Sequence, residues 1–560
     1  MTMLPIKSIP RWATAMLLVV LLAAAALRLH GIAFGLPAVN DPDELMFELG
    51  GLKMLREKTL NPGWFGHPAT TTMYALAMLN AGIYSFGHLA GWFPDAKAFA
   101  EAVYADPGWI ILPGRVLMAG FGVLCIWMTF RLGRDLFGWP TGLAAAALLA
   151  VNPVHITYSQ VVRSDVLGCV FMLLCLQAAI RIARRSERRD YVSAAGWLGL
   201  AVATKWPLAV TSFGVAGAGV LHMLQNPGTR AATVRNLALF ALLSVFALLV
   251  VSPYLVLDHA TVLENLKGEA QPHHLGASGG TPWWNAWWYL RYPLAVGFGL
   301  AGLALVVAGL VLTGRNREVR LVILPVLMMF LLLNISQKLV WDRWALPLLP
   351  LLSIIAAMAF VRLATALGAR LGRRPGLAAL VLLAALLAVP LVMTALAQTR
   401  ERTHDTRQAA SIIARQQIPP GSTVLLEHFA WDLLPTGWRF LFPLGDAGCV
   451  DVRAFLAGKV KYATIDAMRQ GRSNLDFGTV PPGKVESCKA DYALWTQYDR
   501  YRAESTRFPQ ENANYARMLA TGQIIATIRP VPGKSAGRVV RIVRFGHAEV
   551  SPAPLKGNAP

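Results

Sequence analysis

Apolar residues in this chain form long stretches that are separated by short polar or charged segments. A transmembrane helix needs about 20 mostly apolar residues to cross about 30 Å of hydrocarbon. The pattern predicts a polytopic all-α membrane protein with eleven such spans, or about 11 to 13 because the boundary at Lys205-Trp206-Pro207 is weak. The predicted spans lie approximately at residues 12–30, 111–131, 141–157, 165–183, 191–205, 207–224, 236–257, 291–313, 320–336, 344–362 and 376–397.

Lys and Arg are concentrated in every second connection between these spans, as in RLGRD (131–135), RIARRSERRD (181–190) and RNREVR (315–320). Cytoplasmic loops carry such an excess of basic residues, so we expect the N-terminus inside and the C-terminal segment outside. The first span begins like a signal peptide, but no small-residue cleavage site follows it before Arg28. We therefore expect an uncleaved anchor.

Residues 68–93 are apolar enough to suggest a further span. A crossing there would place the basic segment 181–190 outside, against the charge rule. We expect instead a helix that lies at the outer interface or re-enters the membrane. Residues 31–110 then form one large external loop.

The composition changes after residue 397, where charged residues, Pro and Gly return and no span of membrane length remains. We predict a transmembrane domain at 1–397, an extracytoplasmic α/β domain at 398–550 and a disordered tail at 551–560. The strands of the small domain are expected at 424–429, 491–495, 524–528 and 539–545, with helices around 403–416 and 511–520.

Composition agrees with the membrane assignment. The chain has 560 residues, of which 55% are hydrophobic and 15% charged, and its mean hydropathy is +0.47. These values exclude an ordinary soluble enzyme. The formal net charge of +21 belongs mostly to the predicted cytoplasmic loops, so it does not indicate nucleic-acid binding.

The five cysteines divide between the two predicted domains. Three of them, Cys125, Cys169 and Cys175, fall in predicted spans, where small buried apolar residues are common. Cys449 and Cys488 lie in the external domain, where a disulfide is permitted, but the sequence leaves their pairing open. No Cys spacing is typical of a metal site, and the adjacent His273 and His274 rarely share one metal.

Acidic residues at the outer face are the most informative polar positions, because a carboxylate near the bilayer needs a partner, a cavity or a function. Asp41, Asp43 and Glu44 follow the first span, and Asp165 follows the third. The structural interpretation is that these residues cap helices, with Asp165 paired to Arg163. If the external loops converge, however, Asp43 and Asp165 form a two-carboxylate site with one acid acting as a general base.

Basic residues are expected on the same face. Taken singly, each is explained as a snorkelling anchor at the membrane surface. Taken together they suit an anionic lipid headgroup such as a phosphate. These residues are Arg115, Arg163, Lys205, Lys338 and Arg343, and His67 stands at the start of the apolar segment 68–93.

These motifs, in this order, resemble those of the GT-C membrane glycosyltransferases, in particular the dolichyl-phosphate-mannose-protein mannosyltransferases and the bacterial aminoarabinose transferase. The likeness covers roughly residues 12–365. Two positions depart from the family pattern, with Ala69 where a second Pro is usual and Trp344 where Tyr is commoner. The matching residues are Asp43-Glu44, His67-Pro68, Arg115, Gly133-Arg134, Leu136-Phe137-Gly138, Asn152-Pro153, Ser159, Arg163, Asp165, Lys205, Arg343-Trp344, Leu346-Pro347 and Pro350.

The resemblance implies transfer of a sugar, with inversion, from a polyprenyl-phosphate donor to a protein, lipid or glycan hydroxyl on the outer face of the cytoplasmic membrane. Asp43 would be the general base with Glu44 beside it, and Asp165 would orient a substrate. We assign substrate binding to the remaining candidates and no residue to a metal, although the resemblance leaves a divalent metal possible. These remaining candidates are Asp41, His67, Arg115, Arg163, Lys205, Lys338 and Arg343.

Two other functional classes remain open on the sequence. A transporter or flippase of a lipid-linked substrate would place ionisable residues near the membrane midplane, often with internal repeats. A membrane scaffold would use the external domain to bind a partner, and all the acids would then be structural.

Overall fold

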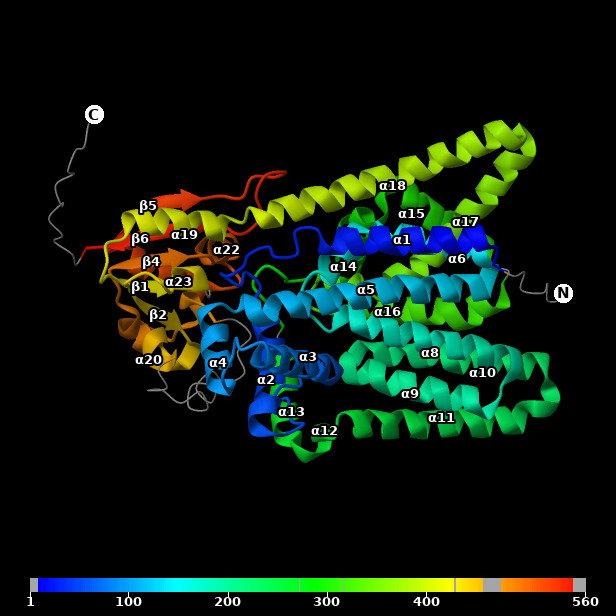
Figure 1. The fold of residues 1–560 in the computed structure, drawn as a ribbon, viewed down its shortest axis with the longest axis horizontal. Helices are drawn as coiled ribbons and strands as arrows, with labels where there is room; N and C mark the ends of the chain where they lie inside the picture. The colour runs from blue at the N-terminus through cyan, green and yellow to red at the C-terminus, as the bar shows by residue number, and fades with distance from the viewer. Residues whose placement is uncertain (1–8, 271, 315, 428–429, 457–474, 547–560) are drawn as a thin grey trace. The chain divides into compact units, whose positions relative to one another are not determined.

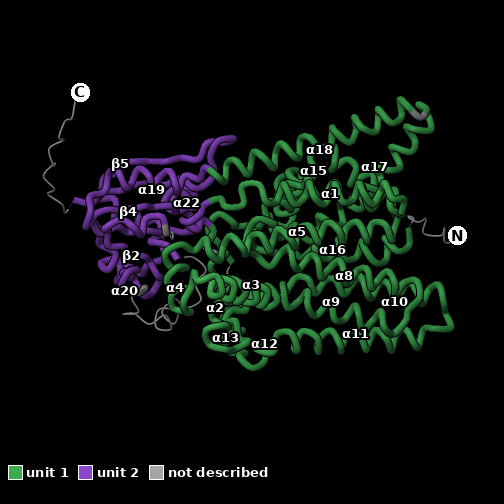
Figure 2. Tube along the Cα trace, in the orientation of Figure 1, with its two compact units in different colours: residues 1–34, 41–403 green, residues 35–40, 404–560 purple. Residues whose placement is uncertain are grey.

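The computed structural model describes residues 9–270, 272–314, 316–427, 430–456 and 475–546. The chain forms two compact units (Figure 2). Unit 1 comprises residues 1–34 and 41–403, and unit 2 comprises residues 35–40 and 404–560. The tail predicted to be disordered, 551–560, lies outside the described residues.

Unit 1 is a bundle of long helices that run alongside one another (Figure 1). Among the described residues, nine helices are long and apolar enough to cross a membrane, or ten if a bent pair counts as one span. The protein is therefore a multi-pass membrane protein. These nine spans correspond to α1 (Arg11–Leu29), α5 (Gly108–Phe137), α8 (Asp165–Arg185), α10 (Ser212–Gln225), α11 (Arg230–Val251), α15 (Ala295–Thr313), α16 (Leu324–Ser336), α17 (Leu348–Leu371) and α18 (Arg373–Thr403). A further long helix, α9 (Arg188–Thr204), is not among the nine.

Each of the eleven predicted spans coincides with a helix, but two fall short of a full span by themselves. Helix α9 has 17 residues. The span predicted at 141–157 consists of α6 (Trp139–Ala150) and α7 (Pro153–Ser159), which meet at a bend of 66°. The short 3₁₀ turn η1 (Trp206–Thr211) leads from α9 into α10.

Shorter helices gather at one end of the bundle (Figure 1). Helix α3 is long enough to span a membrane but not apolar enough to be a candidate span, although it exposes Met78, Phe86 and Leu89. These helices are α2 (Pro42–Glu57), α3 (Thr70–Leu89), α4 (Ala96–Ala105), α12 (Tyr254–Leu257) and α13 (His259–Glu269), and the remaining short elements include α14 (Pro282–Tyr289) and the 3₁₀ turn η5 (Asp342–Ala345).

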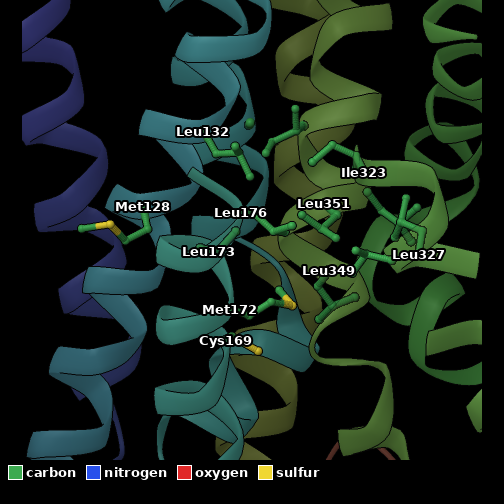
Figure 3. Packing of buried hydrophobic residues seen from close by; sticks show 14 of the residues in the cluster. Met128, Leu132, Cys169, Met172, Leu173, Leu176, Ile323, Leu327, Leu349 and Leu351 are labelled. Atoms are coloured by element: carbon green, nitrogen blue, oxygen red, sulfur yellow. The ribbon is translucent and has the colours of Figure 1, made fainter. Parts of the chain in front are cut away.

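Helix α8 lies at the centre of the main core and is buried along most of its length. Figure 3 shows its residues Cys169, Met172 and Leu173 packed among side chains of neighbouring helices. Small residues let backbones approach closely elsewhere in the bundle. A Cβ atom at Gly133 of α5 would lie 3.1 Å from Cα of Gly142 in α6. Such close packing replaces the hydrophobic effect as the attraction between helices in lipid.

The bend between α6 and α7 is held by buried polar side chains. Arg28 of α1 is fully buried and donates hydrogen bonds to the carbonyls of Leu149 (3.4 Å) and Ala150 (3.0 Å) at the end of α6. Asn152 caps α7 and donates a hydrogen bond to the carbonyl of Gly297 (2.7 Å). Helix α15 is itself interrupted nearby, where Gly299 has φ 64°. Backbone groups freed by two helix breaks therefore find partners inside the protein, as lipid requires.

Unit 2 is an α/β module around one sheet with strand order β3-β2-β1-β4-β6-β5. Strand β1 pairs in parallel with β2 and β4, and the other three pairings are antiparallel. Four strands match the predicted ones, whereas β2 and β3 were not predicted. The strands are β1 (Thr423–Leu426), β2 (Arg439–Pro443), β3 (Cys449–Asp451), β4 (Tyr492–Trp495), β5 (Gly522–Ile528) and β6 (Val540–Phe545), and the longer helices are α19 (Thr406–Gln417) and α23 (Pro509–Leu519).

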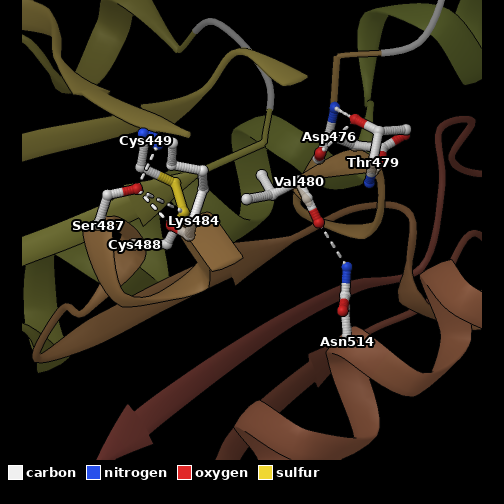
Figure 4. The surroundings of a disulfide bond; sticks show 8 residues. All are labelled: Cys449, Asp476, Thr479, Val480, Lys484, Ser487, Cys488 and Asn514. Carbon is white, nitrogen blue, oxygen red and sulfur yellow. Dashed lines mark hydrogen bonds between the residues drawn. A yellow bond between two sulfur atoms is a disulfide. The ribbon is translucent and has the colours of Figure 1, made fainter. Parts of the chain in front are cut away.

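Cys449 and Cys488 form a disulfide, which resolves the pairing that the sequence left open. The bond joins β3 to the 3₁₀ segment η9 (Pro482–Cys488) across 39 residues of sequence. Ser487 accepts a hydrogen bond from the backbone N–H of Cys449 (2.8 Å) beside it (Figure 4). The three remaining cysteines are free and buried.

Candidate active site

The start of α2 places three acidic residues in one turn. Asp41 caps the helix by accepting a hydrogen bond from the backbone N–H of Asp43 (3.1 Å). Asp43 and Glu44 follow in the first turn, where the helix dipole favours negative charge. Their side chains have different surroundings, because Asp43 keeps 37% of its side-chain surface exposed whereas Glu44 is fully buried.

Arg163 binds two of these carboxylates. Its Nη2 lies 3.0 and 2.9 Å from the two carboxylate oxygens of Asp41, and its Nη1 lies 2.6 Å from Oδ2 of Asp43. Arg163 is 8% exposed and stands in the loop between α7 and α8. Its ion-pair partners are thus 120 or more residues away in sequence, and its neighbour Asp165 pairs elsewhere.

Glu44 and Arg115 of α5 form a fully buried bidentate ion pair with N–O distances of 2.8 and 2.7 Å. Arg115 also donates to the carbonyls of Ile32 (2.8 Å) and Phe34 (2.7 Å). Glu44 accepts a further hydrogen bond from the backbone N–H of Val162 (3.0 Å), the residue before Arg163. Glu44 therefore fixes α2 to the loop that carries Arg163, and so fixes Asp43 relative to its cation.

Asp165 and Lys205 form a second buried ion pair, with 5% and 6% of their surfaces exposed. Asp165 is the first residue of α8, and Lys205 is the C-cap residue that follows α9. The helix-breaking Pro207 in η1 explains why the chain leaves α9 there.

Arg343, in η5, is the site's unpaired cation. It is 8% exposed and, within the described part of the chain, makes no side-chain hydrogen bond or ion pair, and its Nε is buried without a partner. The guanidinium stacks on Trp341 at 4.3 Å from the ring centroid. It interacts electrostatically with both Asp43 and Asp165. Lys338, by contrast, is exposed and does not join this cluster.

His67 faces the same group of charges. It packs edge-on against Trp64, with centroids 5.1 Å apart, and its Nε2 lies 3.7 Å from Oε2 of Glu269. Burial, followed by the positive charges of Lys205 and Arg343, lowers the pKa of His67 to about 3. The imidazole is therefore uncharged at neutral pH and is available as a hydrogen-bonding group.

Asp43 is set up to remain ionised. Burial favours the neutral acid, but the positive charges of Arg163 and Arg343 outweigh it and hold the pKa of Asp43 well below its usual range. Because the side chain is still partly exposed, its carboxylate can be reached by another molecule. An ionised, accessible carboxylate has the properties of a general base.

The charges of the cluster do not cancel pair by pair. Arg163 serves two carboxylates, Lys205 serves one, and Arg343 serves none. One negative charge on the Asp41–Asp43 pair is therefore balanced only at a distance, by Arg343. In this arrangement the carboxylate of Asp43 can accept a proton, and the guanidinium of Arg343 can bind an anion.

In the described ranges, no group of three or more His, Cys, Asp or Glu side chains is arranged to hold a metal ion, and His273 and His274 form no such group. One residue that the sequence analysis missed, Tyr158, interacts electrostatically with Arg163, Asp342 and Arg343. Its place in the polar segment YSQVVRSD was the available signal.

Comparisons with known proteins agree with the fold described above. Residues 98–257 match the family model described as dolichyl-phosphate-mannose-protein mannosyltransferase. ArnT from Cupriavidus metallidurans bound to undecaprenyl phosphate has a similar structure, with 14% identity, a TM-score of 0.53, and coverage of 97% of this chain and 99% of that one. The same protein in the apo state has 16% identity, a TM-score of 0.55, and coverage of 95% of this chain and 98% of that one. The chain has a GT-C glycosyltransferase fold. No curated protein sequence matches it.

The segment matched by the family model contains four residues of the candidate site, namely Arg115, Arg163, Asp165 and Lys205. Asp43 and Glu44 precede this segment and Arg343 follows it. The structure brings these separate parts of the chain together through the contacts described above.

Proposed function

We propose that this protein transfers a sugar from a polyprenyl-phosphate donor to an acceptor hydroxyl, with inversion, at the outer face of the cytoplasmic membrane. The observation that carries the proposal is that one cluster contains both a group able to accept a proton and a group able to bind an anion. Asp43 is an ionised and accessible carboxylate, and Arg343 is a buried cation without a partner in the described residues. The likeness to ArnT, whose structure was solved with undecaprenyl phosphate, supports a lipid-phosphate donor.

In the proposed reaction, the acceptor O–H gives its proton to Asp43 as its oxygen forms a bond to the anomeric carbon of the sugar. The bond from that carbon to the phosphate oxygen breaks on the opposite face, and the electron pair leaves with the phosphate. This geometry inverts the anomeric configuration. The phosphate gains negative charge as it leaves, and cations held in a dry site stabilise such charge strongly. Arg343 and the ammonium of Lys205 are the groups that supply this stabilisation.

The other residues hold the reacting groups. Arg163 and Asp41 orient Asp43, and the Glu44–Arg115 pair anchors α2. Asp165 orients Lys205 and a substrate hydroxyl, and the neutral His67 donates or accepts a hydrogen bond at the sugar. The exposed Lys338 has no part in this scheme.

Two features support placing the site outside the cytoplasm. The Cys449–Cys488 disulfide of unit 2 is typical of an oxidising compartment. The alternating basic connections favour an outer position for the ends of the helices that carry Asp43 and Asp165. The long tail of the donor can stay in lipid there while its headgroup reaches the cluster.

Substitution of Asp43 by Asn tests the proposal, since Asn keeps the shape and removes the base. We expect transfer from a polyprenyl-phosphate sugar by the purified protein to fall by about 10²–10⁴-fold. Asp106→Asn, at an exposed residue before α5, is the matched control and should transfer normally. Undiminished transfer by the Asp43 variant would remove the proposed base.

Movement of labelled lipid across vesicles without covalent transfer would identify a transporter instead. Mass spectrometry of envelope glycans and glycolipids, with and without the gene, identifies the sugar and acceptor.

A further inference from the structure

Glu48 is a buried acid that the proposed reaction does not use. It lies one helical turn beyond Glu44 on the same face of α2, and both residues have no exposed surface. Glu44 has Arg115 as its partner, whereas Glu48 has no cation in the described residues. Its hydrogen bond comes from the amide Nδ2 of Asn80 on α3, at 2.7 Å from Oε2.

The surroundings of Glu48 are apolar. Leu76 of α3 and Val162 lie with its carboxyl group beside Gly114, and both belong to an apolar cluster that also contains residues of α2 and α5. A Cβ atom at Gly114 of α5 would collide with Oε1 of Glu48 and approach Val162 to 3.0 Å. The carboxyl group thus occupies the space that a side chain at position 114 would take, and it is enclosed by three elements.

Glu48 and Asn80 each have one buried oxygen atom that accepts no hydrogen bond in the described residues. These atoms are Oε1 of Glu48 and Oδ1 of Asn80. Both atoms are acceptors, so a proton on the Glu48 carboxyl would supply the donor that the pair lacks. A buried carboxylate without a cation beside it would be costly, whereas a neutral carboxylic acid suits the site.

We propose that Glu48 is a protonated positioning residue that seats α2 against α3 and α5, and that loss of its proton displaces Asp43 from Arg163 and ends transfer at alkaline pH. The proposal rests on the glycosyl transfer proposed above. The link between the two residues is short. Glu48 lies one turn from Glu44, and Glu44 holds both Arg115 and the backbone N–H next to Arg163.

The charges that face Glu48 agree with this assignment. Burial raises the pKa of Glu48 to about 8, the hydrogen bond from Asn80 opposes the rise, and the charge of Glu44 adds to it. Glu44 is the acid facing it from α2, and Arg115 of α5 is already bound to Glu44. Helix α3 contributes only the amide of Asn80. A second negative charge here would compete for the single guanidinium.

The test is the pH profile of kcat/KM for the wild type, Glu48→Gln and the control Glu57→Gln at the exposed end of α2. We expect the wild type and the control to lose about tenfold between their plateau and pH 9, as one group with a pKa of about 8 deprotonates. Glu48→Gln should keep its neutral-pH activity within about twofold and lose the alkaline decline, because Gln stays neutral. An unchanged decline, or an inactive but folded Gln variant, would overturn the proposal.

A second measurement does not depend on activity. The folded chain holds the Glu48 proton where the unfolded chain has lost it, so wild-type stability should fall as the pH rises from about 4.5 to about 8. Glu48→Gln and the apolar Glu48→Met should both lack this contribution in thermal denaturation in detergent. A wild type that transfers no sugar at any pH, yet shows this difference, would contradict the proposed function while supporting the role of Glu48. Identical pH dependence in all variants would contradict that role.

Discussion

Arg163 satisfies two carboxylates with one guanidinium, and this shared contact sets the acid side of the proposed reaction. The positive charge of Arg163 is the largest of the effects that lower the pKa of Asp43 against the opposing effect of burial. Lower pKa means that the base stays ionised to lower pH. The acid limit of transfer is therefore a measure of this one contact.

Replacing Arg163 by Met should raise the pKa of Asp43, because burial then acts with less opposition. The acid limb of the pH profile of kcat/KM should move to higher pH, and Arg163→Lys, which keeps the charge, should move it less. Arg291→Met, at an exposed arginine, is the control and should leave the limb in place. An acid limb that stays where it is in Arg163→Met would mean that Asp43 is not the titrating base.

The identities of the site residues could be predicted from sequence better than their contacts. Asp43, Asp165 and Lys205 stood out because charges at a membrane surface are costly without a purpose. The ion pairs could not be predicted in the same way, because Arg163 binds Asp41 and Asp43 at the start of α2 rather than its neighbour Asp165. Lys338 and Arg343 look alike in the sequence, since both are basic residues just before the tenth predicted span. In the structure Arg343 is buried in the turn η5, whereas Lys338 is exposed.

Arg28 shows how an element, rather than a site, depends on one side chain. Its guanidinium donates to Ala24, Leu149 and Ala150 carbonyls, to Nδ1 of His155 and to the hydroxyl of Ser159. Two of these acceptors are the last carbonyls of α6, where a helix leaves carbonyls without an i+4 donor, although Leu149 also accepts a hydrogen bond from the backbone N–H of Asn152 (3.3 Å). Arg28 thus closes the end of a helix inside the membrane.

Arg28→Met should remove its hydrogen bonds to these carbonyls and lower the free energy of unfolding by on the order of 2 kcal/mol. The measurement is the midpoint of thermal denaturation in detergent, with Arg362→Met at an exposed position of α17 as the control. We expect a clear decrease for Arg28→Met and little change for Arg362→Met. Equal denaturation midpoints for Arg28→Met and the wild type would show that other groups or water replace the contacts of Arg28.

Helices with long apolar stretches could be predicted, whereas one interrupted helix and two of the strands could not. The span predicted at 141–157 is two helices, because Asn152 and Pro153 end one helix and start another. Strand β3 has three residues, too few for a pattern to separate it from loop, and the apolar run of β2 ends in Pro443, which argues against a strand. Their places in the sheet come from pairing with β1 and with each other.

The whole chain carries a topology that its charges predict and its cysteines can test. Five cysteines are present, of which three are free and buried and two form the Cys449–Cys488 bond. If unit 2 lies outside the cytoplasm, that bond forms in the cell. Its presence in native membranes therefore reports the side on which unit 2 folds.

Protein denatured directly from membranes should react with a thiol reagent at three cysteines before reduction and at five after it. Mass spectrometry of the labelled protein counts them. The double variant Cys449→Ser with Cys488→Ser should show three in both conditions. Five reactive thiols without reductant would place unit 2 in a reducing compartment, and the proposed outer-face site would fail with it.

The bend at Asn152 also constrains how the chain is inserted during synthesis. Helix α6 has 12 residues, and at 1.5 Å per residue it spans about 18 Å, well short of the hydrocarbon thickness of about 30 Å. By itself it is too short to cross the membrane, and it shares its apolar span with α7. The tight contact of Gly142 with Gly133 provides a route, since α6 can leave the insertion machinery already paired with α5 as a helical hairpin. A larger residue at either glycine would then impair biogenesis rather than catalysis.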